Sequence, residues 1–351
     1  MRPSVRGIYQ RPGYIYATRA EELARKEGYT RLARLASNEN PFPLSPQAKE
    51  MAREALDEVN RYPPEYQTCL TEALARHCSW RHIVLGNGMD GVIEAVIRTL
   101  IDPGDEVVVA EPTFSFYRVA ATAQTAEVRG VPRKKDFSVD VPAFIHGCRE
   151  AKLAFLCTPN NPTANLTSCE EVRKILDATD TMLFLDNAYI EFADAEYRDL
   201  MAEYDHLIIG RTMSKAFSMA GLRLGYALVP SWFVSPYHRA STPFAVNRVT
   251  AAAALGALSD LDHVRESKAH VAYWRKKFLE SIPYPTFPSQ ANFVLIDTTP
   301  HRGEEMMEQL AKRGILVRSC ESFPGLGDHY IRVNIGADWE NELFLTVINA
   351  L

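Results

Sequence analysis

The chain has 351 residues, of which 46% are hydrophobic and 24% charged, and its formal net charge at pH 7 is −5. This composition is typical of a globular protein and excludes a disordered chain. The net negative charge does not favour binding to nucleic acid. No apolar run reaches the roughly 20 residues of a membrane span.

Targeting and metal signals are also missing from the sequence. The N-terminus lacks the apolar core of a signal peptide. The six cysteines form neither a C-x-x-C pair nor a zinc-ligand spacing, so we expect reduced thiols of a cytoplasmic protein and no metal site. We expect Cys157 in the core and the basic run Arg133–Lys135 in a solvated turn.

Short apolar runs alternate with helical patterns between about residues 45 and 230. Buried strands are predicted at 83–86, 106–110, 152–157, 182–186, 206–210 and 225–229, because these runs are apolar nearly throughout. Helices are predicted at 89–100, at 168–178 and after Thr113. The alternation predicts an α/β domain with a mostly parallel central sheet flanked by helices.

Beyond about residue 235 the predicted elements are fewer and shorter. A long helix is expected over 247–279, strands at 292–296, 315–319 and 330–335, a helix at 303–313 and a helix at the C-terminus. We therefore expect a smaller α+β domain. The predicted division is an N-terminal arm (1–35), a large domain (36–235) and a small domain (236–351).

Polar groups follow five of the predicted strands at the point where each strand ends. The segments are "NGMDG", "EPTFSFY", "TPNNPTAN", "DNAYIEF" and "RTMSK". Ligands of open α/β sheets bind beyond the carboxyl ends of the strands, so these segments predict a single site.

Lys215 is the first candidate for chemistry at that site. Taken alone, a lysine is usually a surface residue. Thr212 and Ser214 precede it and Arg223 follows, and hydroxyls, helix-start N–H groups and a guanidinium all suit a phosphate. Neighbouring cations would lower the pKa of the lysine amine, so that its neutral form could act as nucleophile and base.

The segment "GNGMDG" (86–91) allows two interpretations. It matches the G-x-G-x-x-G dinucleotide fingerprint, and Glu111 lies twenty residues past Gly91. Alternatively, the backbone N–H groups of Gly88, Met89 and Asp90 hold a phosphate without a nucleotide.

Other residues after the strands suit a flat, charged ring. Asp186 is either a turn cap or a buried carboxylate that needs a cation, such as a protonated pyridine nitrogen. Asn161 belongs either to an ordinary loop or to a site where its amide donates to a ligand. Tyr189 could reach the same pocket, and Phe114 is either a core residue or a plate stacked on a heterocycle.

Arg318 and Arg332 lie inside predicted strands, where arginine is unusual. They indicate either an anion clamp or a salt bridge within the small domain. Tyr14 and Tyr62 lie in turn-like segments and matter only if they reach the pocket.

Together these residues resemble the fold-type-I pyridoxal-phosphate aminotransferases and, within that group, the histidinol-phosphate aminotransferases. The similarity spans nearly the whole chain. It rests on "LASNENPFP" (35–43), "NRYPP" (60–64), residues 86–117, "TPNNPT" (158–163), "LDNAYIEF" (185–192), residues 211–226 and "YIRVNIG" (330–336). The ordered motifs are specific for the superfamily and less specific for the substrate.

The resemblance implies roles for single residues. Lys215 would carry pyridoxal phosphate as a Schiff base, Asp186 would keep its pyridine nitrogen protonated, and Asn161 and Tyr189 would bind the ring 3-oxygen. Phe114 would stack on the ring. The cofactor phosphate would be bound by Gly88, Met89, Asp90, Thr212, Ser214 and Arg223. The substrate anion would be bound by Arg332, Arg318, Asn161, Tyr14 and Tyr62, with Tyr62 from the partner subunit of a homodimer.

The implied reaction transfers the amino group of histidinol phosphate to 2-oxoglutarate in histidine biosynthesis. Other possibilities are an aromatic amino acid as donor, a decarboxylase of a phosphorylated amino acid, and a dinucleotide-dependent dehydrogenase. A ligand-sensing regulator would need an attached DNA-binding module, for which the chain has no spare residues.

Two positions depart from the family pattern. Ala164 replaces the glycine of N-P-T-G, and Asn187 replaces the glutamate of D-E-A-Y. If the turn needs a positive φ, we expect Asn165 to adopt it instead of Ala164.

Overall fold

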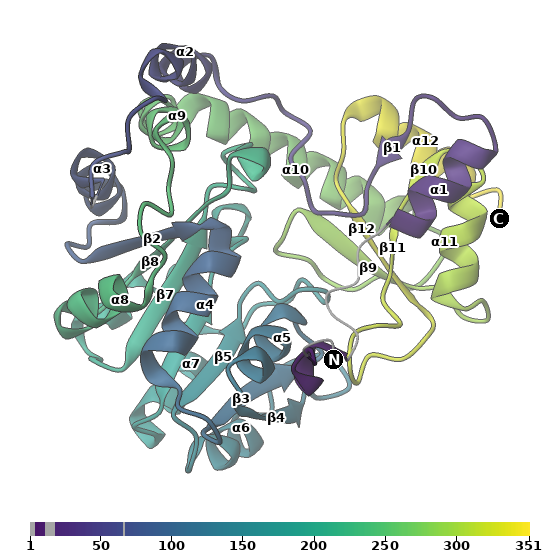
Figure 1. Cartoon of the computed structure of the whole chain (residues 1–351). Coiled ribbons are helices and arrows are strands. Elements are labelled where there is room, and N and C mark those ends of the chain that lie inside the picture. Colours follow the sequence, from purple (N-terminus) through teal and green to yellow (C-terminus); the bar gives the residue numbers. More distant parts are fainter. Residues whose placement is uncertain (1–3, 11–17, 66) are drawn as a thin grey trace.

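A seven-stranded sheet forms the centre of the molecule (Figure 1). The computed structural model describes residues 4–10, 18–65 and 67–351. The strand order is β2-β8-β7-β6-β5-β3-β4, in which β3 to β7 run parallel and β8 is antiparallel to both β7 and β2. The predicted mostly parallel α/β sheet is therefore confirmed. The strands are β2 (Ile83–Asn87), β3 (Glu106–Glu111), β4 (Glu127–Pro132), β5 (Leu153–Cys157), β6 (Met182–Asp186), β7 (Leu207–Thr212) and β8 (Leu224–Leu228).

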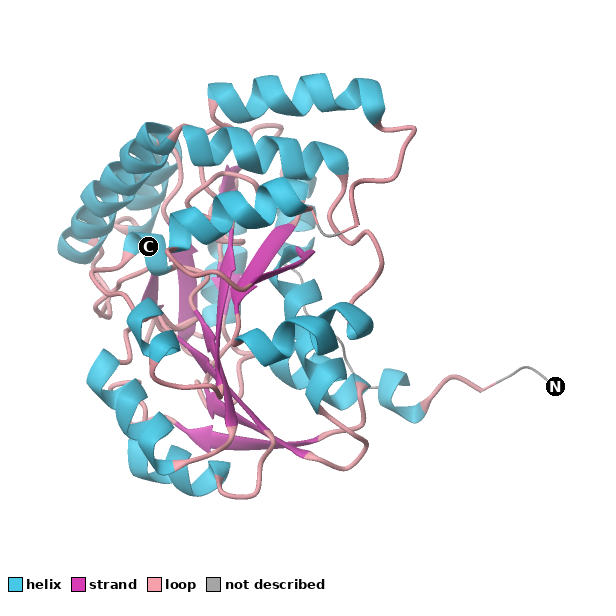
Figure 2. Cartoon of the chain, turned by 90° about the vertical axis from the view of Figure 1, so that its left-hand side faces the viewer, coloured by secondary structure: helices cyan, strands magenta, loops and turns pink. Residues whose placement is uncertain are grey.

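Helices cover both faces of this sheet (Figure 2). Val107 and Val109 of β3 pack with α4 (Gly88–Leu100), α5 (Phe116–Ala123) and α8 (Val234–Ala240). Val108 and Ala110, which point the other way, belong to the core with α6 (Val141–Cys148) and α7 (Cys169–Ala178). Because both faces are buried, the central strands are apolar throughout.

A smaller three-stranded antiparallel sheet lies beside the large one (Figure 1). Its order is β11 (Arg318–Ser319), β12 (Tyr330–Asn334) and β9 (Phe293–Asp297). Next to it, β1 (Ala33–Arg34) pairs in parallel with β10 (Ile315–Leu316). The helices of this part are α1 (Thr18–Lys26), α11 (Gly303–Ala311) and α12 (Asp338–Ile348). The predicted domain boundaries near residues 35 and 235 stay a prediction.

Three helices pack together beyond β2, and a fourth connects the two parts of the molecule. α2 (Pro46–Glu54), α3 (Thr68–Cys78) and α9 (Arg248–Ser259) form the group, and α10 (Leu261–Ser281) runs from it towards the small sheet (Figure 1). Within the described part of the chain, no helix has the length and apolar character that a membrane crossing requires.

Four local predictions are wrong. The expected helix 247–279 is two helices, because Asp260 leaves the helical conformation at φ −124° and ψ 59°. The expected strand 315–319 divides between two sheets, as β10 and β11. The edge strand β4 was missed because it has no apolar run. Arg133 is buried, since its guanidinium donates to the carbonyls of Ala110 and Phe137.

Candidate active site

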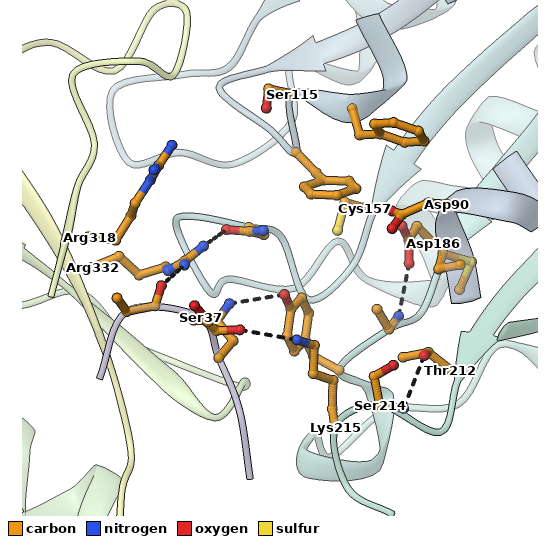
Figure 3. A pocket seen from close by; sticks show the side chains of 18 of the residues that line it. Ser37, Asp90, Ser115, Cys157, Asp186, Thr212, Ser214, Lys215, Arg318 and Arg332 are labelled. Atoms are coloured by element: carbon orange, nitrogen blue, oxygen red, sulfur yellow. Dashed lines mark hydrogen bonds between the residues drawn. The ribbon is translucent and has the colours of Figure 1, made fainter. Parts of the chain in front are cut away.

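A cavity of about 560 Å³ opens between the large and the small sheet, at the carboxyl ends of the parallel strands. Figure 3 shows Arg318 and Arg332 on one side, Asp186, Asp90 and Thr212 on the other, and Lys215 between them. Twelve predicted site residues line it: Met89, Asp90, Phe114, Asn161, Asp186, Tyr189, Thr212, Ser214, Lys215, Arg223, Arg318 and Arg332.

Two of the predicted residues that the structure describes, Tyr62 and Gly88, do not line the cavity. Tyr14 lies outside the described residues. Tyr62 is 79% exposed and stacks on Phe244, with ring centroids 4.7 Å apart. Gly88 lies beneath the site at φ +69°, and a Cβ there would come within 2.3 Å of Nη2 of Arg223. The positive φ therefore favours glycine at position 88, and a side chain there would displace the Arg223 guanidinium.

Lys215 follows β7 and is held by a distant segment of chain. Its Nζ donates to the carbonyl of Ser37 at 3.3 Å, and Nδ2 of Asn40 donates to the Lys215 carbonyl at 2.9 Å. Burial, followed by the charge of Arg332, lowers the pKa of the Lys215 amine to about 8. A substantial fraction of the amine is therefore neutral, and nucleophilic, near neutral pH.

Asp186 ends β6 as a buried carboxylate with two donors. The Ala188 N–H donates to Oδ1 at 3.0 Å, and the Tyr117 hydroxyl donates to Oδ2 at 2.6 Å. Burial raises the pKa of Asp186 to about 6, although both hydrogen bonds oppose the shift. A cation arriving in the cavity would favour the ionised form.

Tyr189 and Asn161 both point into the cavity and both have partners from other elements. The Tyr189 hydroxyl accepts from Nδ2 of Asn38 at 3.0 Å, so its own proton is free to be donated to a ligand. Burial raises the pKa of this phenol, which keeps it protonated. Oδ1 of Asn161 accepts from Nη1 of Arg332 at 2.5 Å, which leaves its amide NH2 as a donor.

The start of α4 and the segment after β7 form an anion-binding corner. The first N–H groups of a helix have no partner within the helix. The Gly88 N–H donates to the Arg223 carbonyl at 2.8 Å, so the available helix-start donors are those of Met89 and Asp90. Thr212 Oγ1 accepts from the Ser214 N–H at 3.1 Å, and Nη2 of Arg223 bonds Oδ2 of Asp90 at 2.8 Å.

Arg318 and Arg332 lie directly opposite each other on β11 and β12. Arg332 is buried, and its two terminal nitrogens donate to neutral oxygens, those of Asn161 and Ala36. Among the described residues no carboxylate forms an ion pair with Arg332, which argues against the salt-bridge alternative for that residue. Like charges opposite each other are destabilising, so the pair favours binding of an anion.

The sequence reasoning missed Tyr117 and Asn38, which bind Asp186 and Tyr189. Both lie in segments that carried the family resemblance, but neither shows a chemical signal of its own. Cys157 is in the core as expected, and it also lines the cavity.

The two departures from the family pattern have structural answers. Ala164 itself takes the left-handed conformation, at φ +63°, so the expectation that Asn165 would do so is wrong. The tight loop requires it, since the Ala164 N–H donates to the Asn160 carbonyl at 2.7 Å. Asn187 is fully buried, and its Nδ2 donates to the Thr158 carbonyl at 2.8 Å.

The strand order excludes the dinucleotide interpretation of "GNGMDG". That motif needs neighbouring parallel strands, whereas β8, β7, β6 and β5 separate β2 from β3. Glu111 is also engaged, because it accepts from Nη2 of Arg118 at 2.8 Å.

Comparison with known proteins agrees with this geometry. Residues 30–351 match the family model "Aminotransferase class I and II". The chain is 58% identical over 352 residues to a histidinol-phosphate aminotransferase of Methanoculleus marisnigri, and 53% identical over 354 residues to one of Methanosphaerula palustris. Each alignment covers 100% of both chains.

The fold has a close counterpart among solved structures. The crystal structure of histidinol-phosphate aminotransferase from Sinorhizobium meliloti in complex with pyridoxal-5'-phosphate superimposes with a TM-score of 0.90 at 26% identity, covering 100% of this chain and 99% of that one. These findings confirm the resemblance drawn from the sequence motifs. The chain therefore belongs to the class I and II aminotransferases, in the group that includes the histidinol-phosphate aminotransferases.

Proposed function

We propose that the chain is a pyridoxal-phosphate-dependent aminotransferase that takes the amino group of histidinol phosphate and passes it to 2-oxoglutarate. The proposed substrate rests on the arginine pair, which faces Lys215 across the cavity. Among the residues that the structure describes, no carboxylate pairs with Arg332. Histidinol phosphate has no carboxylate, so its phosphate supplies the anion. Planar guanidinium groups are well suited to phosphate oxygens.

The residues of the opposite side fit pyridoxal phosphate. Asp186 is a buried acid that gains from a cationic partner, as the ring nitrogen would be. The N–H groups of Met89 and Asp90, the Ser214 hydroxyl and Arg223 supply donors for a phosphate. The Thr212 hydroxyl lies beside them and donates its proton to the Leu224 carbonyl, so it would have to turn to bind the phosphate. When bound, the cofactor supplies an electron sink for the charge left on the substrate carbon after loss of its proton.

Lys215 performs the proton transfer in this proposal. Its neutral amine takes the proton from the substrate carbon that bears the amino group, and its pKa of about 8 suits a base working near neutral pH. Asp186 would hold the ring nitrogen of the cofactor through its negative charge, and Tyr189 would donate its hydroxyl proton to the ring oxygen. Arg332 fixes the far end of the substrate and so sets the distance of the reacting carbon from Lys215.

The test begins with cofactor attachment. Reduction of the yellow protein with borohydride should bleach it and leave a mass adduct on Lys215. A colourless protein without adduct would contradict the proposal. Steady-state kinetics should then show a higher kcat/KM for histidinol phosphate than for phenylalanine or tyrosine, and release of carbon dioxide without need of an oxo acid would indicate a decarboxylase instead.

A second candidate is an aromatic amino acid aminotransferase. Phe114, Phe116 and Phe323 line the cavity and would suit an aromatic side chain. In that case the carboxylate of the donor would bind Arg332 and leave Arg318 less occupied. A preference for phenylalanine over histidinol phosphate in the kinetics above would favour this candidate.

We also propose a homodimer in which Tyr62 reaches the site of the partner subunit. Support comes from the exposed apolar side chains Leu56, Val59, Tyr62 and Phe244 around η2 (Ala55–Glu58). Sedimentation should give the mass of two chains, and Tyr62→Ala should raise KM without changing that mass. A monomer with full activity would contradict this arrangement. The cytoplasmic location stays a prediction.

A further inference from the structure

Tyr117 lies directly behind Asp186, on the side away from the cavity. Its side chain is fully buried on α5, it does not line the cavity, and its hydroxyl donates to Oδ2 of Asp186 at 2.6 Å. The separation of 69 residues makes this a tertiary contact between α5 and the end of β6. The hydroxyl of Tyr117 can therefore affect a ligand only through a residue that lines the cavity, and Asp186 is the residue to which it donates.

The ring of Tyr117 is locked by its aromatic neighbours. It stacks on Phe155 with centroids 4.7 Å apart and planes at 8°, and it meets the ring of Phe114 edge-on at 5.5 Å and 84°. Phe155 lies on β5, next to the strand that carries Asp186. The hydroxyl is therefore held in position by packing and does not depend on the ligand.

The contact orients the Asp186 carboxylate and favours its ionised form. With the Ala188 N–H on Oδ1 and the Tyr117 hydroxyl on Oδ2, each oxygen has one donor and retains lone pairs for the cavity. Hydrogen bonds to an ionised carboxylate favour the ionised form. Burial and the charge of Asp186 raise the pKa of Tyr117 well above its usual range, so the phenol stays a donor at every working pH.

We propose that Tyr117 is a positioning residue that aims Asp186 at the ring nitrogen of pyridoxal phosphate and keeps that carboxylate ionised. The inference rests on the proposed function, because the ring nitrogen is the cation that Asp186 receives. In this proposal the stacked rings of Tyr117 and Phe155, behind the cofactor site, fix the direction in which the Asp186 carboxylate points.

The test is Tyr117→Phe, which removes the hydroxyl and keeps the ring. Cofactor-free wild type and variant are titrated with pyridoxal phosphate carrying 15N in its ring. Loss of a hydrogen bond to a charged group predicts about tenfold weaker binding or more. The 15N signal should move from the protonated position towards that of an unprotonated pyridine, whereas wild type should stay protonated.

A matched control separates this effect from a general loss of packing in the protein core. Tyr237 is also fully buried, and its hydroxyl donates to the Leu85 carbonyl at 2.9 Å, away from Asp186. Tyr237→Phe should leave both the cofactor affinity and the 15N signal as in wild type. An equal change in both variants, or no change in Tyr117→Phe, overturns the proposal.

The double variant tests whether Tyr117 acts through Asp186. In an Asp186→Asn background, Tyr117→Phe should have no further effect on affinity or on the 15N signal, and a full additional loss overturns the proposal.

If Tyr117→Phe fails to fold, the Tyr117 hydroxyl proton is observed in wild type instead. It should give a downfield NMR signal that shifts when the cofactor binds, and an unmoved signal overturns the proposal. If wild type binds no pyridoxal phosphate, the proposed function fails, which is a different result.

Discussion

The cavity has two walls, which differ in the charges that they carry. The large-sheet wall, defined by Asp186, Thr212 and Lys215, combines a carboxylate, a hydroxyl and an amine, each with a hydrogen-bond partner within the protein. The arginine wall, defined by Arg318 and Arg332, places two like charges opposite each other, and Arg332 donates to the neutral oxygens of Asn161 and Ala36. The first wall contains both an acidic and a basic group, whereas the second carries positive charge that we expect an anion to balance. Changes in the large-sheet wall should therefore reduce kcat, and changes in the arginine wall should mainly raise KM.

The largest effect is expected for Lys215→Ala. Turnover should be lost, because in the proposed mechanism Lys215 supplies the amine that takes the substrate proton. Absorbance under single-turnover conditions with a large excess of enzyme is the measurement. Lys174→Ala, on the exposed face of α7, should keep wild-type activity. If Lys215→Ala retained activity, Lys215 would not be the base of the reaction.

Asp186→Ala should reduce kcat by about 10²–10³-fold, the usual effect of removing one preorganised electrostatic group. Substrate KM should change less, since Asp186 lies across the cavity from the arginines in Figure 3. Asp180→Ala, on an exposed turn after α7, is the control. A rate within a few-fold of wild type would contradict the assigned role.

On the arginine wall, Arg332→Lys should lower kcat/KM for histidinol phosphate by about 10- to 100-fold, mostly through KM. Lysine keeps the charge but loses the planar fork. Arg318→Lys should have a smaller effect, because Arg318 is only half-buried. Arg302→Lys, an exposed arginine paired with Asp328 at 3.5 Å, should have no effect. A loss confined to kcat would contradict the contrast between the walls.

The smallest effect concerns pH. In the proposed function the neutral form of Lys215 reacts with pyridoxal phosphate, and the fraction of this form rises as pH increases through the pKa of about 8. The rate of cofactor attachment to cofactor-free protein should rise about tenfold from pH 7 to pH 9 and then level off. Stopped-flow absorbance measures it. A rate still rising above pH 10 would mean that the pKa of Lys215 is not lowered.

The sequence predicts the residues of the large-sheet wall better than the residues that hold the site's side chains in place. Strand ends are visible in apolar runs, so the sequence alone places Asp186 and Lys215 at one edge of a sheet. It does not reveal the roles of Tyr117 and Asn38, because their hydrogen bonds to Asp186 and Tyr189 span 69 and 151 residues. Such contacts depend on tertiary packing and leave no periodic signal.

Short or irregular elements escaped prediction for a related reason. The break at Asp260 and the two-residue strands β10 and β11 are shorter than any window in which periodicity can be read. The arginine pair shows what the sequence can and cannot predict. Both arginines are predicted as site residues, but their position opposite each other is given only by the β11–β12 register.

Residues 36–40 hold several parts of this site in place at once. Ala36 accepts from Arg332, Ser37 accepts from Lys215 and Asn38 donates to Tyr189, across separations of 296, 178 and 151 residues. Closing loops of this length costs entropy before any contact compensates for it. We therefore expect Lys215 to reach its final setting only in chains where this segment of five residues has docked, so that assembly of the active site itself checks that the fold is complete.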